Sequence, residues 1–172
     1  MNVSEERAVN RRFNGTWVAA VIVVVDQITK AIVRQRFELH ESVVVIPNFF
    51  DLTRVHNTGA AFGMLNNADF PFKSVVLVLV AFAALAGVAM YAAMLPPAQW
   101  LARIGLAFIL GGAAGNLSDR VMLGYVVDFF DFYWRGWHFW AFNVADAAIT
   151  VGVGLMILDL LGLGTRRVSR TI

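Results

Sequence analysis

Long apolar stretches separated by polar segments dominate this chain of 172 residues. Four of the stretches approach the roughly 20 apolar residues that a helix needs to cross a bilayer. They lie at about residues 16–33, 72–94, 100–117 and 141–163. Pro96 and Pro97 end the second stretch, because proline cannot continue a helix. The pattern predicts an all-α membrane protein with four transmembrane helices in a single domain, residues 1–172.

The polar segments at about residues 34–71 and 118–140 fall on the same side of the membrane if there are four spans. Both termini then lie on the other side. Arginines cluster in the two tails, which favours a cytoplasmic location for them and an extracytoplasmic location for the polar segments. An alternative is that the first apolar stretch is a cleaved export signal, since Arg11 and Arg12 precede it. No small-residue cleavage site follows it, so we favour a spanning helix.

Short strands are predicted within the polar segments. Residues 43–46 and 49–56 are rich in valine and aromatic residues and flank a turn at Pro47-Asn48, and residues 125–130 have a similar composition. A small sheet outside the membrane is therefore expected. The aromatic residues between 129 and 142 are typical of an interfacial belt.

Composition narrows the class of protein. Hydrophobic residues make up 59% of the chain and charged residues 15%, against about 45–50% and 25% in ordinary soluble domains. The absence of cysteine excludes disulfides, thiolate metal sites and a cysteine nucleophile. The net charge is only +2 and no basic face is visible, so we expect no nucleic acid partner.

Several ionisable and amide side chains interrupt the apolar stretches, where an aspartate costs about 2.5–3.5 kcal/mol at the centre of a span. Asp26 and Lys30 are four residues apart, which suits an ion pair on one helix face. In the predicted topology these residues share the outer half of the membrane with five others. The five are Asn116, Asp119, Arg120, Asn143 and Asp146. Their common depth indicates one site.

Asp128 and Asp146 differ from the other acidic residues because apolar neighbours flank both. Two carboxylates that face each other in a poorly solvated site share one proton, which is the requirement of an aspartic protease. Asp119 is instead expected to form a fixed ion pair with Arg120, so we prefer Asp128 as the partner of Asp146. The sequence leaves open whether Asp119 replaces Asp128.

Other chemistries fit the pattern less well. Ser118 could pair with Lys30 as a serine–lysine dyad, and His56 or His138 could join aspartates at a metal, but no HExxH spacing is present. We expect neither a metal nor a cofactor. A small transporter or channel subunit and a non-catalytic assembly factor remain alternatives. The charges gather at one depth instead of threading the bilayer, which speaks against transport.

Five sequence blocks, in this order, resemble the bacterial lipoprotein signal peptidase family, also called signal peptidase II. The resemblance covers about residues 20–160. The blocks are Asp26-Gln27-Ile28-Thr29-Lys30, Asn57-Thr58-Gly59-Ala60-Ala61-Phe62, residues 111–120, Val126-Val127-Asp128-Phe129 and Phe142-Asn143-Val144-Ala145-Asp146.

The resemblance implies four membrane helices with a small extracytoplasmic β-rich cradle and a short amphipathic helix. It also implies an aspartic endopeptidase of the bacterial inner membrane, with its active site near the outer face. Its substrates would be diacylglyceryl-modified prolipoproteins, cut before the lipidated cysteine. The other expected partners are membrane lipid and an inhibitory cyclic peptide of the globomycin type in the cleft. We expect the protein to be a monomer.

The family's catalytic aspartates correspond to Asp128 and Asp146. Its supporting polar residues correspond to Asp26, Lys30, Asn57, Asn116, Asp119, Arg120 and Asn143. We expect Asn116, Arg120 and Asn143 to orient the substrate or the dyad. Asp26, Lys30 and Asp119 are expected to hold helices together. The loop from Asn57 to about residue 65 is expected to close over the substrate as a lid.

Overall fold

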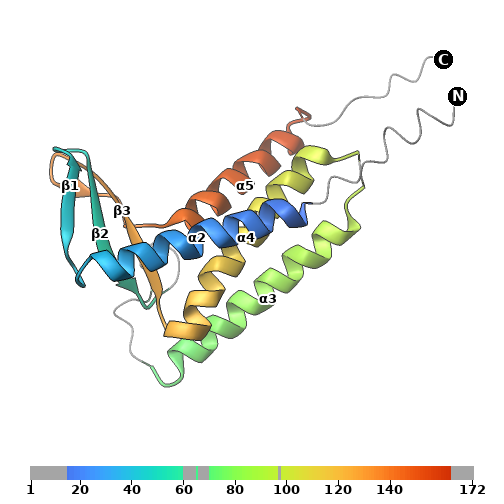
Figure 1. Cartoon of the computed structure of the whole chain (residues 1–172). Helices are drawn as coiled ribbons and strands as arrows, with labels where there is room; N and C mark the ends of the chain where they lie inside the picture. The colour runs from blue at the N-terminus through green and yellow to red at the C-terminus, as the bar shows by residue number, and fades with distance from the viewer. Residues whose placement is uncertain (1–14, 60–64, 66–69, 97, 164–172) are drawn as a thin grey trace, which may run out of the picture.

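The computed structural model describes residues 15–59, 65, 70–96 and 98–163, and in this part of the chain it contains four long helices and four strands (Figure 1). The helices lie along one another, and the sheet lies at the end of the bundle that α2 reaches with its last turn. In chain order, the elements are α2 (Thr16–Arg36), β1 (Ser42–Ile46), β2 (Phe50–Asn57), α3 (Lys73–Met94), α4 (Trp100–Leu123), β3 (Val126–Trp134), β4 (Trp137–His138) and α5 (Val144–Leu160).

Three of the helices, α2, α3 and α4, are long and apolar enough to cross a membrane. None of the residues of α3 is buried in the protein, so its apolar side chains need another apolar environment. Helix α5 has 17 residues, or about 26 Å at 1.5 Å per residue, slightly less than the roughly 30 Å of a bilayer core. Three spans are therefore supported by the helices, and the fourth stays a prediction.

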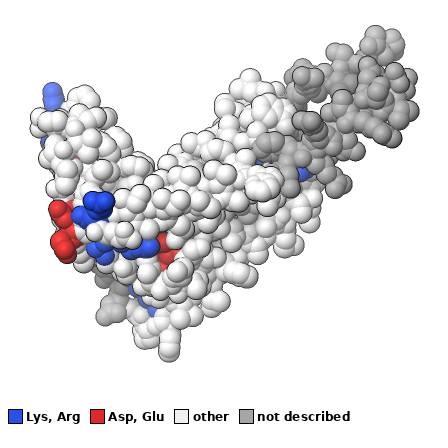
Figure 2. All heavy atoms as spheres, in the orientation of Figure 1, with Lys and Arg blue, Asp and Glu red and all other residues white. Residues whose placement is uncertain are grey.

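Charged side chains gather at the end of the molecule that carries the sheet (Figure 2). The visible flank of the helical bundle is almost free of them. An uncharged flank along the helices and a charged end suit a chain whose helices lie in lipid while the sheet lies in water or at the interface.

The polar end of α4 is helical for longer than expected. The third apolar stretch was predicted to end at about residue 117, but α4 continues to Leu123, where Gly124 adopts a φ of 82° as C-cap. Ser118, Asp119 and Arg120 therefore lie on a helix and not in the second polar segment. Asp119 is buried and paired inside the bundle, so its polarity does not end the helix.

Helix α5 starts later than the apolar stretch suggested. Residues 141–143 precede the helix, and Asn143, which has an extended backbone, caps it through a capping box with Asp146. The short amphipathic helix implied by the family resemblance is not found in the described ranges, which hold no helix besides the four long ones.

Glycines allow α4 to pack closely against its neighbours. A Cβ on Gly111 would lie 2.8 Å from the carbonyl oxygen of Ala19 in α2. Gly105 of α4 and Gly152 of α5 face each other, and a Cβ on Gly105 would lie 2.7 Å from the carbonyl oxygen of Gly152. Such small-residue contacts are typical of helices that pack within membranes, and here they bring the polar residues of three helices together.

The sheet is antiparallel with strand order β1-β2-β3-β4. The two strands predicted around Pro47-Asn48 are confirmed as β1 and β2, and the strand predicted at 125–130 is confirmed as the first part of β3. Val33 of α2 packs against Val127 and Phe129 of β3. Arg54 of β2 donates hydrogen bonds to the carbonyls of Arg34 (3.2 Å) and Phe37 (2.8 Å) at the end of α2. These contacts fix β2 and β3 against α2.

Candidate active site

Asp128 lies on β3 where the strand meets the helices, and it is only 2% exposed. Asn57 of β2 donates a hydrogen bond from Nδ2 to one carboxylate oxygen of Asp128 (3.0 Å). Asn143 donates from Nδ2 to the other oxygen (2.7 Å). Both oxygens therefore have an amide donor, so the carboxyl group is held in one orientation.

Asp146 lies in the first turn of α5. Its Oδ2 accepts a hydrogen bond from the backbone N–H of Asn143 (3.2 Å), and its own N–H donates to Oδ1 of Asn143 (3.0 Å). Asn116 of α4 donates from Nδ2 to Oδ1 of Asp146 (2.8 Å). The N-terminus of a helix favours negative charge, so this position suits an ionised carboxylate.

Asn143 thus contacts both aspartates that the sequence analysis singled out, although residues 128 and 146 come from different elements. Its side chain is fully buried. It also donates to Oδ1 of Asn116 (3.1 Å). The structure therefore places Asp128, Asp146, Asn143, Asn116 and Asn57 in one hydrogen-bonded group.

Burial, and secondarily the negative charge of Asp146, raises the pKa of Asp128 from 3.8 to about 7. The hydrogen bonds from Asn57 and Asn143 and the positive charge of Lys30 oppose this rise. At neutral pH a substantial fraction of Asp128 consequently carries a proton that it can donate.

A second buried group lies next to the first. Lys30 contacts Asp26 (2.9 Å) and Asp119 (3.2 Å), and all three side chains are at most 1% exposed. Its third hydrogen bond goes to Oδ1 of Asn116 (2.8 Å). Since an ammonium group only donates, Lys30 fixes the amide of Asn116 with Oδ1 toward itself and Nδ2 toward Asp146.

Gln27 belongs to this second group, although the sequence analysis gave it no role. Its Nε2 donates to Asp119 (3.0 Å), to the carbonyl of Gly115 (3.2 Å) and to Asp26 (3.3 Å). A signal was present in the sequence. Gln27 is a polar residue in an apolar stretch and lies three residues before Lys30, on a neighbouring part of the helix surface.

The expected ion pair between Asp119 and Arg120 is wrong. Within the described part of the chain, Asp119 pairs with Lys30, whereas Arg120 donates from Nη2 to the carbonyl of Gly59 (2.6 Å). Successive residues of an α-helix point about 100° apart, so the two side chains of Asp119 and Arg120 leave α4 in different directions. Arg120 instead holds the chain just beyond Asn57.

In the part of the chain that the structure describes, the residues of the alternative chemistries do not come together. The hydroxyl of Ser118 donates to the carbonyl of Ala114 within its own helix (2.8 Å), and Lys30 is occupied by three other acceptors. His56 stacks on Tyr125, and His138 contacts Asp131 on the exposed side of β3. Neither histidine contacts Asp128 or Asp146.

A cavity of about 350 Å³ adjoins the candidate dyad. One part of its wall is polar, and the rest consists of small and apolar residues from α3, α4, β3 and α5. Its lining residues are Asn57, Ala81, Ala84, Ala113, Asn116, Leu117, Arg120, Val126, Asp146 and Ile149. An apolar segment that enters this cavity would lie against Asp146.

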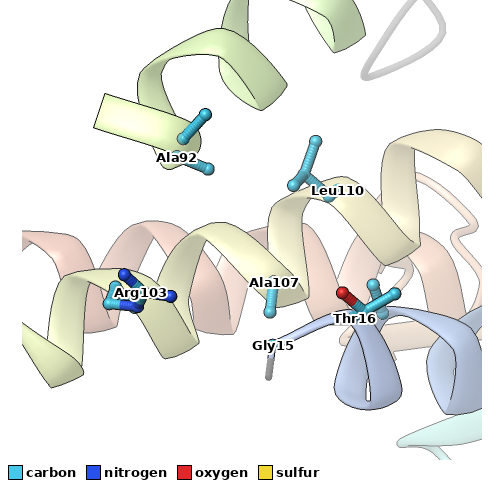
Figure 3. A pocket seen from close by; sticks show the side chains of 8 residues that line it. Gly15, Thr16, Ala92, Arg103, Ala107 and Leu110 are labelled. Carbon is cyan, nitrogen blue, oxygen red and sulfur yellow. The ribbon is translucent and has the colours of Figure 1, made fainter. Parts of the chain in front are cut away.

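A second cavity, of about 300 Å³, lies at the other end of the bundle (Figure 3). Thr16 at the start of α2, Ala92 of α3, and Arg103 and Ala107 of α4 line it. The described residues that line it include no member of the candidate active site, so the two cavities are separate among these residues.

Comparisons with known proteins identify the family of the chain. Residues 18–162 match the family model described as signal peptidase (SPase) II. The lipoprotein signal peptidase of Symbiobacterium thermophilum is 50% identical over 83% of this chain and 91% of its own length. The lipoprotein signal peptidase of Geobacter metallireducens is 46% identical over 84% of this chain and 88% of its own length.

Two solved structures of bacterial membrane enzymes have a similar fold. A bacterial membrane enzyme determined by the in meso method at 2.3 Å resolution superposes with a TM-score of 0.76 and 32% identity, covering 93% of this chain and 96% of the other. A second bacterial membrane enzyme, at 1.9 Å resolution, superposes with a TM-score of 0.73 and 29% identity. This match covers 87% of this chain and 94% of the other. The chain belongs to the signal peptidase II family, the lipoprotein signal peptidases.

Proposed function

We propose that the protein is an intramembrane aspartic endopeptidase. It removes signal peptides from diacylglyceryl-modified prolipoproteins and cuts before the lipidated cysteine. The family relationship supports the substrate class, because the relatives are lipoprotein signal peptidases. The observation that carries the catalytic type is Asn143, whose hydrogen bonds link the carboxyl groups of Asp128 and Asp146.

The two aspartates take different roles in this proposal. Asp146, at the N-terminus of α5, is the ionised member and takes a proton from the attacking water. Asp128 holds the shared proton and donates it to the oxygen of the scissile carbonyl. The product of this step is a neutral tetrahedral geminal diol.

Collapse of the diol returns the dyad to its starting state. Asp146 gives its proton to the leaving nitrogen as the C–N bond breaks, and Asp128 takes a proton from one diol hydroxyl as the carbonyl reforms. The products are an amine and a carboxylic acid. Asn57, Asn116 and Asn143 keep the carboxyl groups oriented throughout, which lowers the cost of reorganisation during the reaction.

The cavity beside Asp146 is the proposed site for the substrate. Ala81 and Ala84 of α3 leave space for an extended segment, and Arg120 and Asn57 supply donors for its carbonyls. A cyclic peptide of the globomycin type would occupy the same cavity. The loop from Asn57 to about residue 65 is the proposed lid, and residues 60–64 of it lie outside the described residues.

The proposed setting is the bacterial inner membrane, with α5 as the fourth span and the sheet on the outer side as a cradle. Both termini would then be cytoplasmic. The arginines that favour this orientation, in the two tails, lie outside the described residues. In the described part of the chain, all polar groups of the site come from the end of the bundle that carries the sheet, where a lipid-anchored substrate would present its scissile bond. We propose that the enzyme acts as a monomer.

The test uses purified protein in nanodiscs with a diacylated prolipoprotein peptide, and mass spectrometry identifies the bond that is cut. Wild type is compared with Asp128→Asn, Asp146→Asn and Asp119→Asn, each checked for thermal stability. We expect cleavage before the lipidated cysteine, abolished in the first two variants while the fold is retained. If Asp128→Asn still cut while Asp119→Asn did not, the dyad partner would be wrong. If folded wild type bound the peptide without cutting it, the protein would be a binding factor.

A further inference from the structure

We propose that Lys30 is a positioning residue that sets the distance between Asp128 and Asp146, acting through Asp26 and Asp119. This inference rests on the proposed function, because it assigns a task to a buried group that the chemical steps do not use. It goes beyond holding helices together, the role expected for these three residues from the sequence.

Each buried carboxylate holds the backbone next to one member of the dyad. Asp119 accepts a hydrogen bond at Oδ2 from the N–H of Val127 (3.1 Å), the residue before Asp128. Asp26 accepts one at Oδ1 from the N–H of Ala145 (3.0 Å), the residue before Asp146. The two catalytic side chains are thus attached to backbone segments whose positions depend on Asp119 and Asp26.

Lys30 joins these two carboxylates. Its Nζ lies 2.9 Å from Asp26 and 3.2 Å from Asp119, and its third donor reaches Asn116 at 2.8 Å. An ammonium group has three N–H bonds, so all its donors are used within this group. Gln27 bridges the same two carboxylates, with contacts of 3.3 Å to Asp26 and 3.0 Å to Asp119.

Charge makes the bridge necessary. Asp26 and Asp119 are both almost completely buried, and like charges in such a site repel strongly. The cation between them holds the two carboxylates close to each other. Without it they would repel each other and separate, and the backbone at Val127 and Ala145 would follow. Since displacements of about 1 Å can cost roughly 100-fold in rate, a small change at Lys30 is expected to affect turnover.

The charged groups around Asp128 also predict how its titration changes when the Lys30 cation is removed. Lys30 lowers the pKa of Asp128 and Asp146 raises it, and Arg120 lies close enough to interact with both. Loss of the Lys30 cation, which also leaves Asp119 uncompensated, would therefore move the loss of the Asp128 proton to higher pH. This shift reports the loss of the Lys30 charge near Asp128, whereas a fall in kcat reports the loss of positioning.

The experiment compares Lys30→Met, Gln27→Met and Ser118→Ala in nanodiscs, each checked for folding by its thermal transition. Lys30→Met keeps most of the side-chain volume and removes the bridge. We expect kcat to fall by about 100-fold or more with KM within about 3-fold. In the pH profile of kcat for Lys30→Met, the alkaline limb should also move to higher pH. Ser118→Ala is the matched control, because its hydroxyl bonds only within α4 beside Asp119; kcat should stay within about 2-fold.

Gln27→Met covers the case in which Lys30→Met does not fold. It removes the second bridge without changing the charge, so we expect a smaller fall in kcat, about 5- to 10-fold, and an unchanged alkaline limb. Folded Lys30→Met with wild-type kcat and an unshifted limb would overturn the inference. So would an unfolded Lys30→Met together with wild-type kcat for Gln27→Met. Cleavage by Asp128→Asn in the same assay would instead refute the assignment of Asp128 to the dyad, and a folded wild type that does not cut would refute the proposed function.

Discussion

The side chain of Asn143 donates a 2.7 Å hydrogen bond to Asp128, although the same residue also caps the helix that carries Asp146. This one buried asparagine therefore determines both where α5 begins and how the carboxyl group of Asp128 is oriented. This double role can be separated experimentally, because a helix cap needs only a side-chain oxygen, whereas the bond to Asp128 needs the amide N–H.

The variants Asn143→Ser and Asn143→Ala make this separation. Serine keeps a capping oxygen and loses the amide donor, and alanine loses both. We expect both variants to lose most of the cleavage activity, with alanine less stable than serine by about 1 kcal/mol. Thermal unfolding and turnover, measured on the same preparations, provide the comparison. Near wild-type turnover in Asn143→Ser would show that the amide contact to Asp128 is dispensable.

Activity should depend on pH through Asp128. Burial raises the pKa of Asp128 to about 7, and the proposed reaction needs its proton. We therefore expect kcat/KM to fall about tenfold per pH unit at pH values well above 7. The measurement uses a lipidated peptide with no ionisable group close to the cut site, between pH 5.5 and 9. A flat profile up to pH 9 would contradict a catalytic proton on Asp128.

Asp128 should also make the stability of the fold depend on pH. The direction of this dependence is opposite to that caused by a salt-bridged aspartate. Because the pKa of Asp128 is higher in the folded state than its ordinary value of 3.8, the folded state binds more protons than the unfolded state between about pH 4 and 7. The free energy of unfolding contributed by Asp128 therefore decreases as the pH rises through this window.

The variant Asp128→Asn lacks this pH-dependent loss. We expect its thermal transition to exceed that of wild type at pH 8, and the difference to shrink toward pH 4. The full difference between pKa values of 3.8 and about 7 corresponds to roughly 4 kcal/mol at most. The comparison requires wild type and variant in the same lipid at both pH values. A difference in stability that does not change with pH would contradict the raised pKa.

Local sequence patterns predicted much of this molecule. The spacing of Asp26 and Lys30 predicted an ion pair, and the pair forms at 2.9 Å. Valine-rich and aromatic runs around Pro47 predicted two strands that are present as β1 and β2. These features depend on residues within one turn of a helix or one hairpin, so the sequence contains the information directly.

Features that depend on contacts between distant elements could not be predicted in this way. Asp119 was assigned to its neighbour Arg120, but its partner is Lys30, from another helix. The same contact explains why α4 continues past residue 117, since a polar residue with a buried partner need not end a helix. Gln27 was overlooked because two of its three acceptors, Gly115 and Asp119, lie 88 and 92 residues away along the chain.

Close packing between α4 and α5 gives the last prediction. A Cβ on Gly152 would lie 2.5 Å from the carbonyl oxygen of Gly105 and 2.8 Å from Cγ1 of Ile109, so the helices would have to separate. On the same helix, a Cβ on Gly154 would meet nothing within 4 Å. We expect Gly152→Ala to lower the stability by about 1–3 kcal/mol.

The matched variant Gly154→Ala should leave the stability unchanged or raise it by up to about 1 kcal/mol, because alanine favours helix more than glycine. Because α5 carries Asp146 and α4 carries Asn116, separation of the two helices should also lengthen the 2.8 Å contact between these residues and reduce turnover. Thermal unfolding and peptide cleavage of the two variants test both effects. Equal stability and equal turnover in Gly152→Ala and Gly154→Ala would mean that α4 and α5 tolerate a wider spacing than this packing implies.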